Sequence, residues 1–179
     1  MKRSTLPVIL IIDDIDVILD EEGVVSKFLN MMQGIRQMGL RVIASTNYPD
    51  KIDPRLLEPG RLSKVVHVPL PQEADRYGVL MTYMKRLPIR SDEQEAIARE
   101  MAERTEGWSH RYLWELTVDA GRLCVEQEQD DLQRSHFDEA FPELEKRVQI
   151  AELKEWDEKI KKKVSEVGSF RAFFISPSA

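Results

Sequence analysis

The stretch Val8-Ile-Leu-Ile-Ile-Asp-Asp-Ile-Asp16 decides the fold of this chain. Residues 8–12 are apolar at every position and rich in β-branched side chains, which is typical of a strand buried on both faces of a sheet. Asp13 and Asp14 follow directly, and ligands bind at the carboxyl ends of the strands in open parallel sheets. Two adjacent acids there also fit a simple turn, so the pair alone does not specify a chemistry.

Two more buried strands are predicted. One covers residues 40–46, around Val42-Ile43-Ala44, and a shorter one covers residues 65–68. Between the first two strands, apolar residues at helical spacing indicate a helix over residues 25–38, with Gly39 as its stop. A helix between two fully apolar strands predicts a parallel sheet.

The rest of the chain is predicted to be helical. After Pro71 the sequence shows no further strand pattern. Four helices are expected, beginning near Glu73, Ser91, Ser109 and Ser135. A fifth, highly charged helix is expected between residues 143 and 167. Its apolar residues recur every three or four positions, which favours a docking or coiled-coil helix over a core helix; they are Leu153, Trp156, Ile160, Val164 and Val167.

Composition excludes several classes of protein. The 179 residues include 32 acids and 26 bases, a net charge of −6, which argues against a general nucleic-acid binder. A single cysteine, Cys124, excludes an internal disulfide and a cysteine-based zinc site, and fits a reducing compartment. The longest apolar run, Leu6 to Ile12, is far shorter than the ~20 residues of a membrane helix. We therefore expect a soluble, cytoplasmic protein without a membrane partner.

A polar residue and an arginine complete the candidate site. Asn47 follows the second predicted strand, so it is expected at the same sheet edge as the two acids, where it could orient a water or a phosphate oxygen. Farther on, Ile52-Asp53-Pro54 fits a helix N-cap with proline in the first turn. The turn at residues 58–60 then holds Arg61 on a loop.

Taken in order, these segments resemble the AAA family of ATPases. Val8–Asp16 is similar to its Walker B strand, Val42–Arg61 to its second region of homology with sensor 1, and Glu106–Ser109 with the following helix to its C-terminal lid. The resemblance runs from about Pro7 to Phe141. It implies an α/β fold, part of a P-loop NTPase parallel sheet, followed by a small all-helical lid domain. The expected domains are 1–70 (α/β nucleotide-binding part), 71–141 (lid) and 142–179 (charged amphipathic helix and tail).

The resemblance also implies cofactors and roles, with ATP and Mg as the cofactors. Asp13 would hold the magnesium ion through its water shell, and Asp14 stands where the family has a glutamate that polarises the attacking water. Asn47 would be the sensor 1 residue near the γ-phosphate. Arg61 matches the second of two arginine fingers, which act in the neighbouring subunit's site. Arg111, in the lid, is either a sensor 2 arginine that contacts nucleotide or a solvated residue.

Three departures from the family pattern qualify this resemblance. Asp14 is one methylene shorter than glutamate, a displacement of about 1.5 Å, and misplacement on that scale can cost on the order of a hundredfold in rate. Glu58 stands where the first arginine finger is expected, so it should pair with a base such as Arg55 or Lys64. A phosphate-binding loop ends in Gly-Lys-Ser/Thr, and none of the eight glycines precedes a lysine.

We therefore interpret the chain as the C-terminal half of an AAA ATPase core, expected to be inactive alone because the P-loop is missing. Its parent is expected to form a ring of six copies, to hydrolyse ATP, and to remodel or unfold protein substrates. The alternative is a non-catalytic assembly or regulatory module with little or no hydrolysis. A third hypothesis, an ATPase that loads onto nucleic acid, depends on Arg111 alone.

Overall fold

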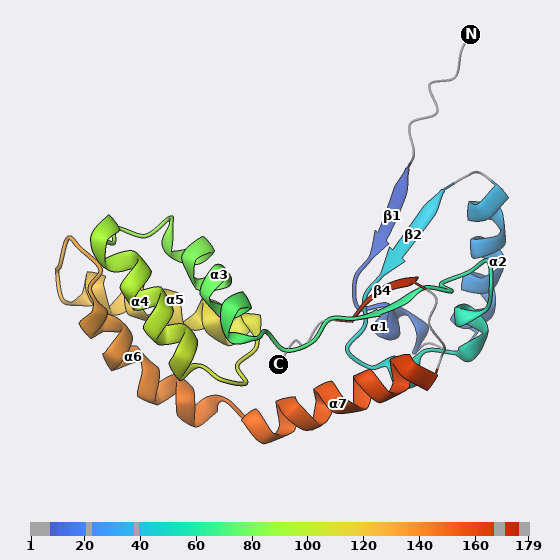
Figure 1. Cartoon of the computed structure of the whole chain (residues 1–179). Helices are drawn as coiled ribbons and strands as arrows, with labels where there is room; N and C mark the ends of the chain where they lie inside the picture. The colour runs from blue at the N-terminus through green and yellow to red at the C-terminus, as the bar shows by residue number, and fades with distance from the viewer. Residues whose placement is uncertain (1–7, 21–22, 38–39, 167–170, 176–179) are drawn as a thin grey trace, which may run out of the picture. The chain divides into compact units, whose positions relative to one another are not determined.

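The computed structural model describes residues 8–20, 23–37, 40–166 and 171–175. The chain divides into two compact units (Figure 1). Of the described residues, those up to Pro69 and those from Glu158 to Ile175 form the α/β unit, and Leu70–Asp157 form the helical unit. Two predicted features, the helix stop at Gly39 and the last apolar position at Val167, lie outside the described residues.

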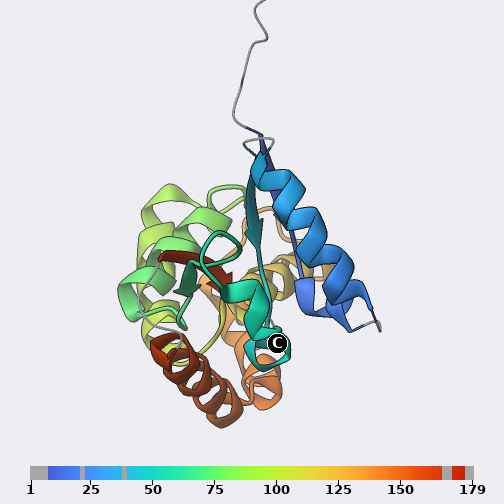
Figure 2. The ribbon, with the colours of Figure 1, turned by 90° about the vertical axis from the view of Figure 1, so that its right-hand side faces the viewer.

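A parallel strand pair carries the candidate site. The α/β unit begins with four elements: β1 (Ile9–Ile12), α1 (Ile15–Leu19), α2 (Val24–Gln37) and β2 (Arg41–Ala44). β1 and β2 run parallel, with Ile9 opposite Arg41 and Ile12 opposite Ala44, so their carboxyl ends lie side by side. In both ribbon views α2 runs beside this pair (Figures 1 and 2). The predicted strand–helix–strand arrangement is confirmed.

A second parallel pair contains a strand that the sequence did not predict. β3 (Val65–His67) pairs with β4 (Arg171–Ile175), which also contacts β2. The expectation that no strand follows Pro71 is therefore wrong. The C-terminal segment shows neither alternation nor a long apolar run, and its strand conformation depends on pairing with β3, which lies about a hundred residues earlier in the chain.

The side chains of β1 are exposed, although the sequence predicts a strand covered on both faces. Ile9 and Ile11 keep 51% and 72% of their accessible surface, and Val8 and Leu10, which point to the opposite face, are exposed as well. Apolar strands of parallel sheets are normally covered on both faces. The described part of the chain leaves both faces of β1 largely exposed, with Leu10 and Ile12 partly covered.

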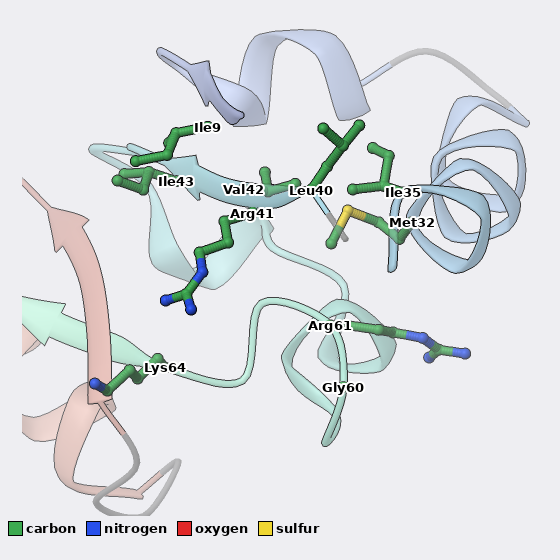
Figure 3. Close-up of a pocket in the computed structure, with 10 residues that line it drawn as sticks. All are labelled: Ile9, Met32, Ile35, Leu40, Arg41, Val42, Ile43, Gly60, Arg61 and Lys64. Carbon is green, nitrogen blue, oxygen red and sulfur yellow. The ribbon is translucent and has the colours of Figure 1, made fainter. Parts of the chain in front are cut away.

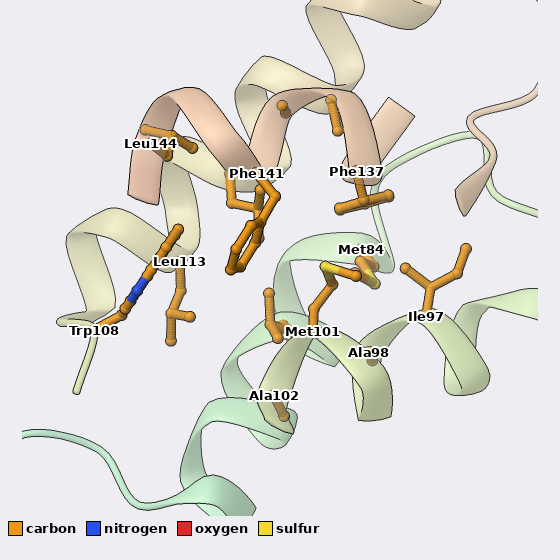
Figure 4. Close-up of a cluster of buried hydrophobic side chains, with 14 of the residues drawn as sticks. Met84, Ile97, Ala98, Met101, Ala102, Trp108, Leu113, Phe137, Phe141 and Leu144 are labelled. Carbon is orange, nitrogen blue, oxygen red and sulfur yellow. The ribbon is translucent and has the colours of Figure 1, made fainter. Parts of the chain in front are cut away.

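Four helices pack around one core in the helical unit. They are α3 (Glu73–Met84), α4 (Ser91–Arg104), α5 (His110–Glu126) and α6 (Arg134–Arg147). Trp108, just before α5, stacks on Phe141 of α6 with ring centroids 5.2 Å apart. Figure 4 shows both rings among the buried aliphatic side chains of α4 and α5.

Among the described residues, none of the helices has the length and apolar character that a membrane span requires.

The last helix, α7 (Ile150–Glu166), belongs to both units, because the division falls between Asp157 and Glu158. Leu153 is 7% exposed and forms part of the helical unit's core, and Ile160 is 2% exposed. The predicted helix is confirmed. Its interpretation as a docking helix is wrong at Leu153 and Ile160, because both side chains are buried within this chain.

Gly107 lies in the loop between α4 and α5, close to Ile150 of α7. We expect Gly107→Ala to lower the free energy of unfolding of the helical unit by about 2 kcal/mol. Gly107 has φ +80°, where an L-residue costs ~1–2 kcal/mol. A Cβ atom there would lie 2.8 Å from Cγ2 of Ile150. Denaturant unfolding followed by circular dichroism measures the change. Gly121→Ala is the matched control: a Cβ at that helical position meets open space, so that variant should be neutral or slightly more stable. Equal effects of the two changes would contradict the prediction.

Candidate functional site

The parallel register brings the residues after β1 and β2 together. Because Ile12 lies opposite Ala44, the acidic segment after β1 faces the polar segment after β2. Backbone hydrogen bonds continue past the strands: the Ser45 amide donates to the Ile12 carbonyl, and the Ile15 amide donates to the Ser45 carbonyl, both at 2.9 Å. The two loops are therefore held at a fixed spacing.

Ser45 connects both candidate acids to the second loop. Its hydroxyl donates to Oδ1 of Asp13 and accepts the backbone amide of Asp14 at 3.1 Å. Next to it, Nδ2 of Asn47 donates to Oδ1 of Asp14 at 3.3 Å. The structure thus brings Asp13, Asp14 and Asn47 to one edge, as the sequence predicts. Both carboxylates are exposed, whereas Asn47 is half-buried.

A second, buried pair of side chains, Thr46 and Asp16, joins the same two loops. The Thr46 hydroxyl donates to Oδ1 of Asp16 and accepts the amide of Tyr48 at 3.0 Å. Asp16 is 4% exposed and Thr46 is 1% exposed. No role was predicted for Thr46, Asp16 or Ser45 from the sequence. The available signal was their position: a Ser-Thr pair after one parallel strand, opposite an Asp-Asp-Ile-Asp turn after its neighbour.

Asp14 adopts an uncommon backbone conformation. Its φ of 47° and ψ of 53° place it in the left-handed region, directly before α1. Aspartate and asparagine visit this region more readily than other non-glycine residues. In this conformation the Asp14 carboxylate accepts the hydrogen bond from the Asn47 side chain.

The loop that carries Arg61 begins at the predicted N-cap and binds the Arg61 side chain. The N-cap is confirmed: Asp53 precedes the 3₁₀ turn Pro54–Leu57 and accepts a hydrogen bond from the Arg55 amide at 2.9 Å. The Arg55 guanidinium also hydrogen-bonds to Asp53, and these bonds lower the pKa of that carboxyl below its usual value. Nη1 of Arg61 donates to the Arg55 carbonyl at 2.5 Å and to Oε2 of Glu58 at 2.6 Å.

Glu58 pairs with a basic residue, as the sequence predicts, but the partner is Arg61 and not Arg55 or Lys64. Arg55 pairs with Asp53 instead. Arg61 lies three residues after Glu58, and the Pro59-Gly60 turn folds its side chain back onto Glu58.

Arg111, the remaining predicted site residue, belongs to the helical unit. It lies in the first turn of α5, where Nε donates to Oε1 of Glu115 at 3.2 Å, and its side chain is 59% exposed. Glu115 also pairs with Arg147 of α6 at 3.4 Å. Within its own unit, Arg111 therefore takes part in a partly exposed ion-pair network.

The acidic edge fits a magnesium ion that is shared with a ligand. Carboxylate oxygens are ligands that Mg²⁺ prefers, and Mg²⁺ usually keeps several waters and takes one or two carboxylates together with phosphate oxygens. Asp13 and Asp14 are exposed at this edge. Among the described residues, no group of three or more His, Cys, Asp or Glu side chains is arranged to hold a metal ion. A magnesium ion here would therefore need water and ligand oxygens in addition to carboxylate.

A separate pocket of about 660 Å³ lies elsewhere in the α/β unit (Figure 3). Apolar residues of β1, α2 and β2 line it together with Arg41 and Lys64. Arg61 also contributes to the lining, but Figure 3 shows its guanidinium directed away from Arg41 and Lys64. Asp13, Asp14 and Asn47 do not line this pocket. We place the candidate site at the acidic edge, because the groups capable of chemistry lie there.

Parallel strands with a polar, acidic carboxyl edge, followed by a helical unit, define part of a P-loop NTPase fold. Residues 1–70 match the model of the ATPase family associated with various cellular activities (AAA). The chain belongs to this family and carries part of its ATPase core.

Three relatives illustrate the match. The chain is 31% identical over 134 residues to the cell division cycle protein 48 homolog of Archaeoglobus fulgidus, covering 69% of the chain and 18% of that protein. It is 30% identical over 168 residues to the ATPase family gene 2 protein of Saccharomyces cerevisiae, covering 87% and 21%. It is 30% identical over 157 residues to the proteasome-activating nucleotidase of Thermococcus onnurineus, covering 80% and 38%. The matched region therefore spans well under half of each relative.

Proposed function

We propose that this chain supplies the Walker B, sensor 1 and arginine-finger part of an ATPase that couples ATP hydrolysis to the remodelling of protein substrates. The observation that carries the proposal is the hydrogen-bonded edge where Ser45 links Asp13 to Asp14 and Asn47 reaches Asp14 at 3.3 Å. Two carboxylates beside an amide can hold a metal–phosphate complex and orient a water molecule next to it.

Each side chain at the edge has a distinct role in this proposal. Asp13 binds the water shell of a magnesium ion, and Ser45 holds the carboxylate in place. Asp14 accepts a hydrogen bond from the attacking water, and Asn47 orients the Asp14 carboxylate and senses the γ-phosphate. When it is bound, magnesium neutralises phosphate charge. In the hydrolysis we propose, water attacks the γ-phosphorus and its proton passes toward Asp14. The bond between the γ-phosphorus and the β–γ bridging oxygen breaks, and ADP and inorganic phosphate leave.

The exposure of strand β1 indicates that the ATPase core extends beyond the described residues. Ile9 and Ile11 are 51% and 72% exposed, and apolar parallel strands are normally covered. We infer that additional α/β structure, including a phosphate-binding loop, completes the sheet in the active ATPase. The assembly we propose is a ring of six copies in the cytoplasm, with Arg61 acting on the neighbouring subunit's nucleotide.

A second candidate function is a non-catalytic assembly or regulatory module. The Glu58–Arg61 ion pair favours it, because a carboxylate 2.6 Å from Nη1 neutralises the arginine that would otherwise meet phosphate. The short Asp14 side chain favours it as well. Such a module keeps the subunit interface and turns over little or no ATP.

Two measurements test the proposal. The 179-residue chain is first titrated with MgATP by calorimetry, and weak or undetectable binding is expected because phosphate contacts in this fold come mainly from the P-loop. A dissociation constant in the low micromolar range would contradict that expectation. The second measurement is ATP hydrolysis by a form in which this chain follows a Walker A segment, that is, a phosphate-binding loop ending in Gly-Lys-Ser/Thr. This form is called the ATPase form below. Turnover that disappears in Asp13→Ala supports the ATPase, whereas MgATP binding without turnover supports the regulatory module.

In that ATPase form we expect Asp14→Asn to lower kcat by about a hundredfold while the nucleotide affinity stays nearly unchanged. The substitution removes the charge that receives the proton, yet asparagine tolerates the left-handed backbone and can still accept from Asn47. Asp14→Glu should preserve or raise kcat. Steady-state kinetics and calorimetry separate the two effects, and an unchanged kcat in Asp14→Asn would show that Asp14 is structural.

A further inference from the structure

We propose that Asp16 and Thr46 are positioning residues, whose buried hydrogen bond fixes the Asp14 loop against the Asn47 loop. This inference rests on the proposed function, because it concerns how the two side chains that face water and γ-phosphate are held. Neither residue is placed to meet nucleotide: Asp16 is 4% exposed and Thr46 is 1% exposed.

The hydrogen bond joins two segments that are 30 residues apart. The Thr46 hydroxyl donates to Oδ1 of Asp16, which lies two residues after Asp14. Thr46 immediately precedes Asn47, so the bond directly links the residues that flank the candidate pair. The same hydroxyl accepts the amide of Tyr48 at 3.0 Å and so also fixes the backbone on the far side of Asn47.

Because Asp16 is buried, breaking its hydrogen bond to Thr46 is energetically costly. A buried carboxylate is costly unless it is hydrogen-bonded, and a hydrogen bond to a charged group is stronger than a neutral one. The alternative arrangement, with the loops apart, leaves the Asp16 carboxylate without the Thr46 hydroxyl. The backbone bonds of Ser45 set the spacing of the loops at the strand ends. We infer that the Thr46–Asp16 bond holds the segments beyond them, next to Asn47 and Asp14, whose own exposed contact at 3.3 Å is long for a hydrogen bond.

The same link accounts for the conformation of Asp14. Between the strand end at Ile12 and the fixed side chain of Asp16, the chain must turn within three residues, and Asp14 in the left-handed region makes that turn. Backbone strain of this kind persists where the surroundings over-determine it. Here the surroundings are the Ser45 contacts on one side and the Thr46–Asp16 bond on the other.

The test compares variants of the whole chain by NMR. Thr46→Val keeps the side-chain shape and removes the hydroxyl. We expect the amides of Ile15 and Tyr48 to exchange with solvent at least about tenfold faster, and the Asn47 side-chain amide signals to shift toward those of a free asparagine. Thr46→Ser should restore the wild-type pattern. Thr117→Val is the matched control, because Thr117 is also buried at 3% exposure and its hydroxyl donates to a carbonyl within α5.

The outcomes are distinct. If Thr46→Val lowers the melting temperature but leaves the Ile15 exchange rate and the Asn47 signals unchanged, the bond is only structural and the proposal is overturned. If Thr46→Val does not fold, Asp16→Asn replaces it. That variant keeps an acceptor oxygen without the charge, so smaller shifts in the same direction are expected, and unchanged Asn47 signals again overturn the proposal.

Kinetics provide a second readout in the ATPase form. Misplacement of about 1 Å can cost on the order of a hundredfold, so Thr46→Val should lower kcat about ten- to a hundredfold with little change in KM. A rise in KM with kcat unchanged would contradict the positioning role. An inactive wild-type protein would refute the proposed function but not the positioning, because the NMR comparison does not require ATP.

Discussion

Replacing Arg76 by alanine should lower the free energy of unfolding of the helical unit by about 3–5 kcal/mol. Arg76 lies in α3 and is 4% exposed. Its Nε donates to the Ala102 carbonyl in α4, and its Nη1 donates to the Pro71 carbonyl before α3, both at 2.9 Å. Alanine would leave two carbonyl groups without these donors and a space where the side chain had packed.

The electrostatic surroundings of Arg76 make this position specific for arginine. Burial lowers the pKa of its guanidinium from the usual value, and the nearby carboxylates of Glu73, Glu106 and Asp75 oppose that shift. Lysine has one nitrogen and cannot make both bonds in the same planar geometry. We therefore expect Arg76→Lys to recover only part of the lost stability.

Thermal unfolding measures the effect. For a unit of this size, each kcal/mol shifts the melting temperature by roughly 4–8 °C, so Arg76→Ala should lower it by more than about 12 °C. The control is Arg122→Ala on α5, where a 56% exposed side chain pairs with Glu126 and the expected cost is ~0.5 kcal/mol. A loss for Arg76→Ala that is no larger than that of the control would show that its two hydrogen bonds contribute little.

The sequence predicted the elements whose pattern is local. β1, α2 and β2 follow from apolar periodicity, and the carboxyl-edge placement of Asp13, Asp14 and Asn47 follows from the parallel order. Hydrogen bonds confirm that the loop of Asn47 reaches both acids, because Asn47 bonds to Asp14 and the nearby Ser45 bonds to Asp13.

Features that depend on distant partners could not be predicted in the same way. β4 forms against a strand about a hundred residues earlier, and the burial of Arg76 depends on a carbonyl in another helix. Thr46 and Asp16 were visible in the sequence, but only the one-to-one register of β1 and β2 shows that they meet. The partner of Glu58 was missed because the turn at Gly60, with φ +88°, reverses the chain and returns Arg61 to it.

Arg61→Ala should lower ATP hydrolysis by about a thousandfold or more in the ATPase form, the magnitude typical for removal of an arginine finger. The guanidinium is 33% exposed and bound to Glu58, which is 56% exposed. Exposed ion pairs contribute only ~0–1 kcal/mol, so an incoming triphosphate, with its greater negative charge, can displace Glu58. On the same reasoning Glu58→Gln, which frees the arginine, should preserve or modestly raise the rate.

Mixed rings test whether Arg61 acts on a neighbouring subunit. Two variants, each inactive alone, are combined: one carries Arg61→Ala and the other lacks the Walker A lysine. Some interfaces then pair an intact Arg61 with an intact nucleotide site, so partial activity should return. No recovery in rings confirmed as mixed by native mass spectrometry leaves two explanations: Arg61 does not act in trans, or one defective subunit silences the ring. Titrating Arg61→Ala into wild type distinguishes them, because activity that falls far faster than linearly indicates silencing. A linear fall without recovery shows that Arg61 serves its own subunit.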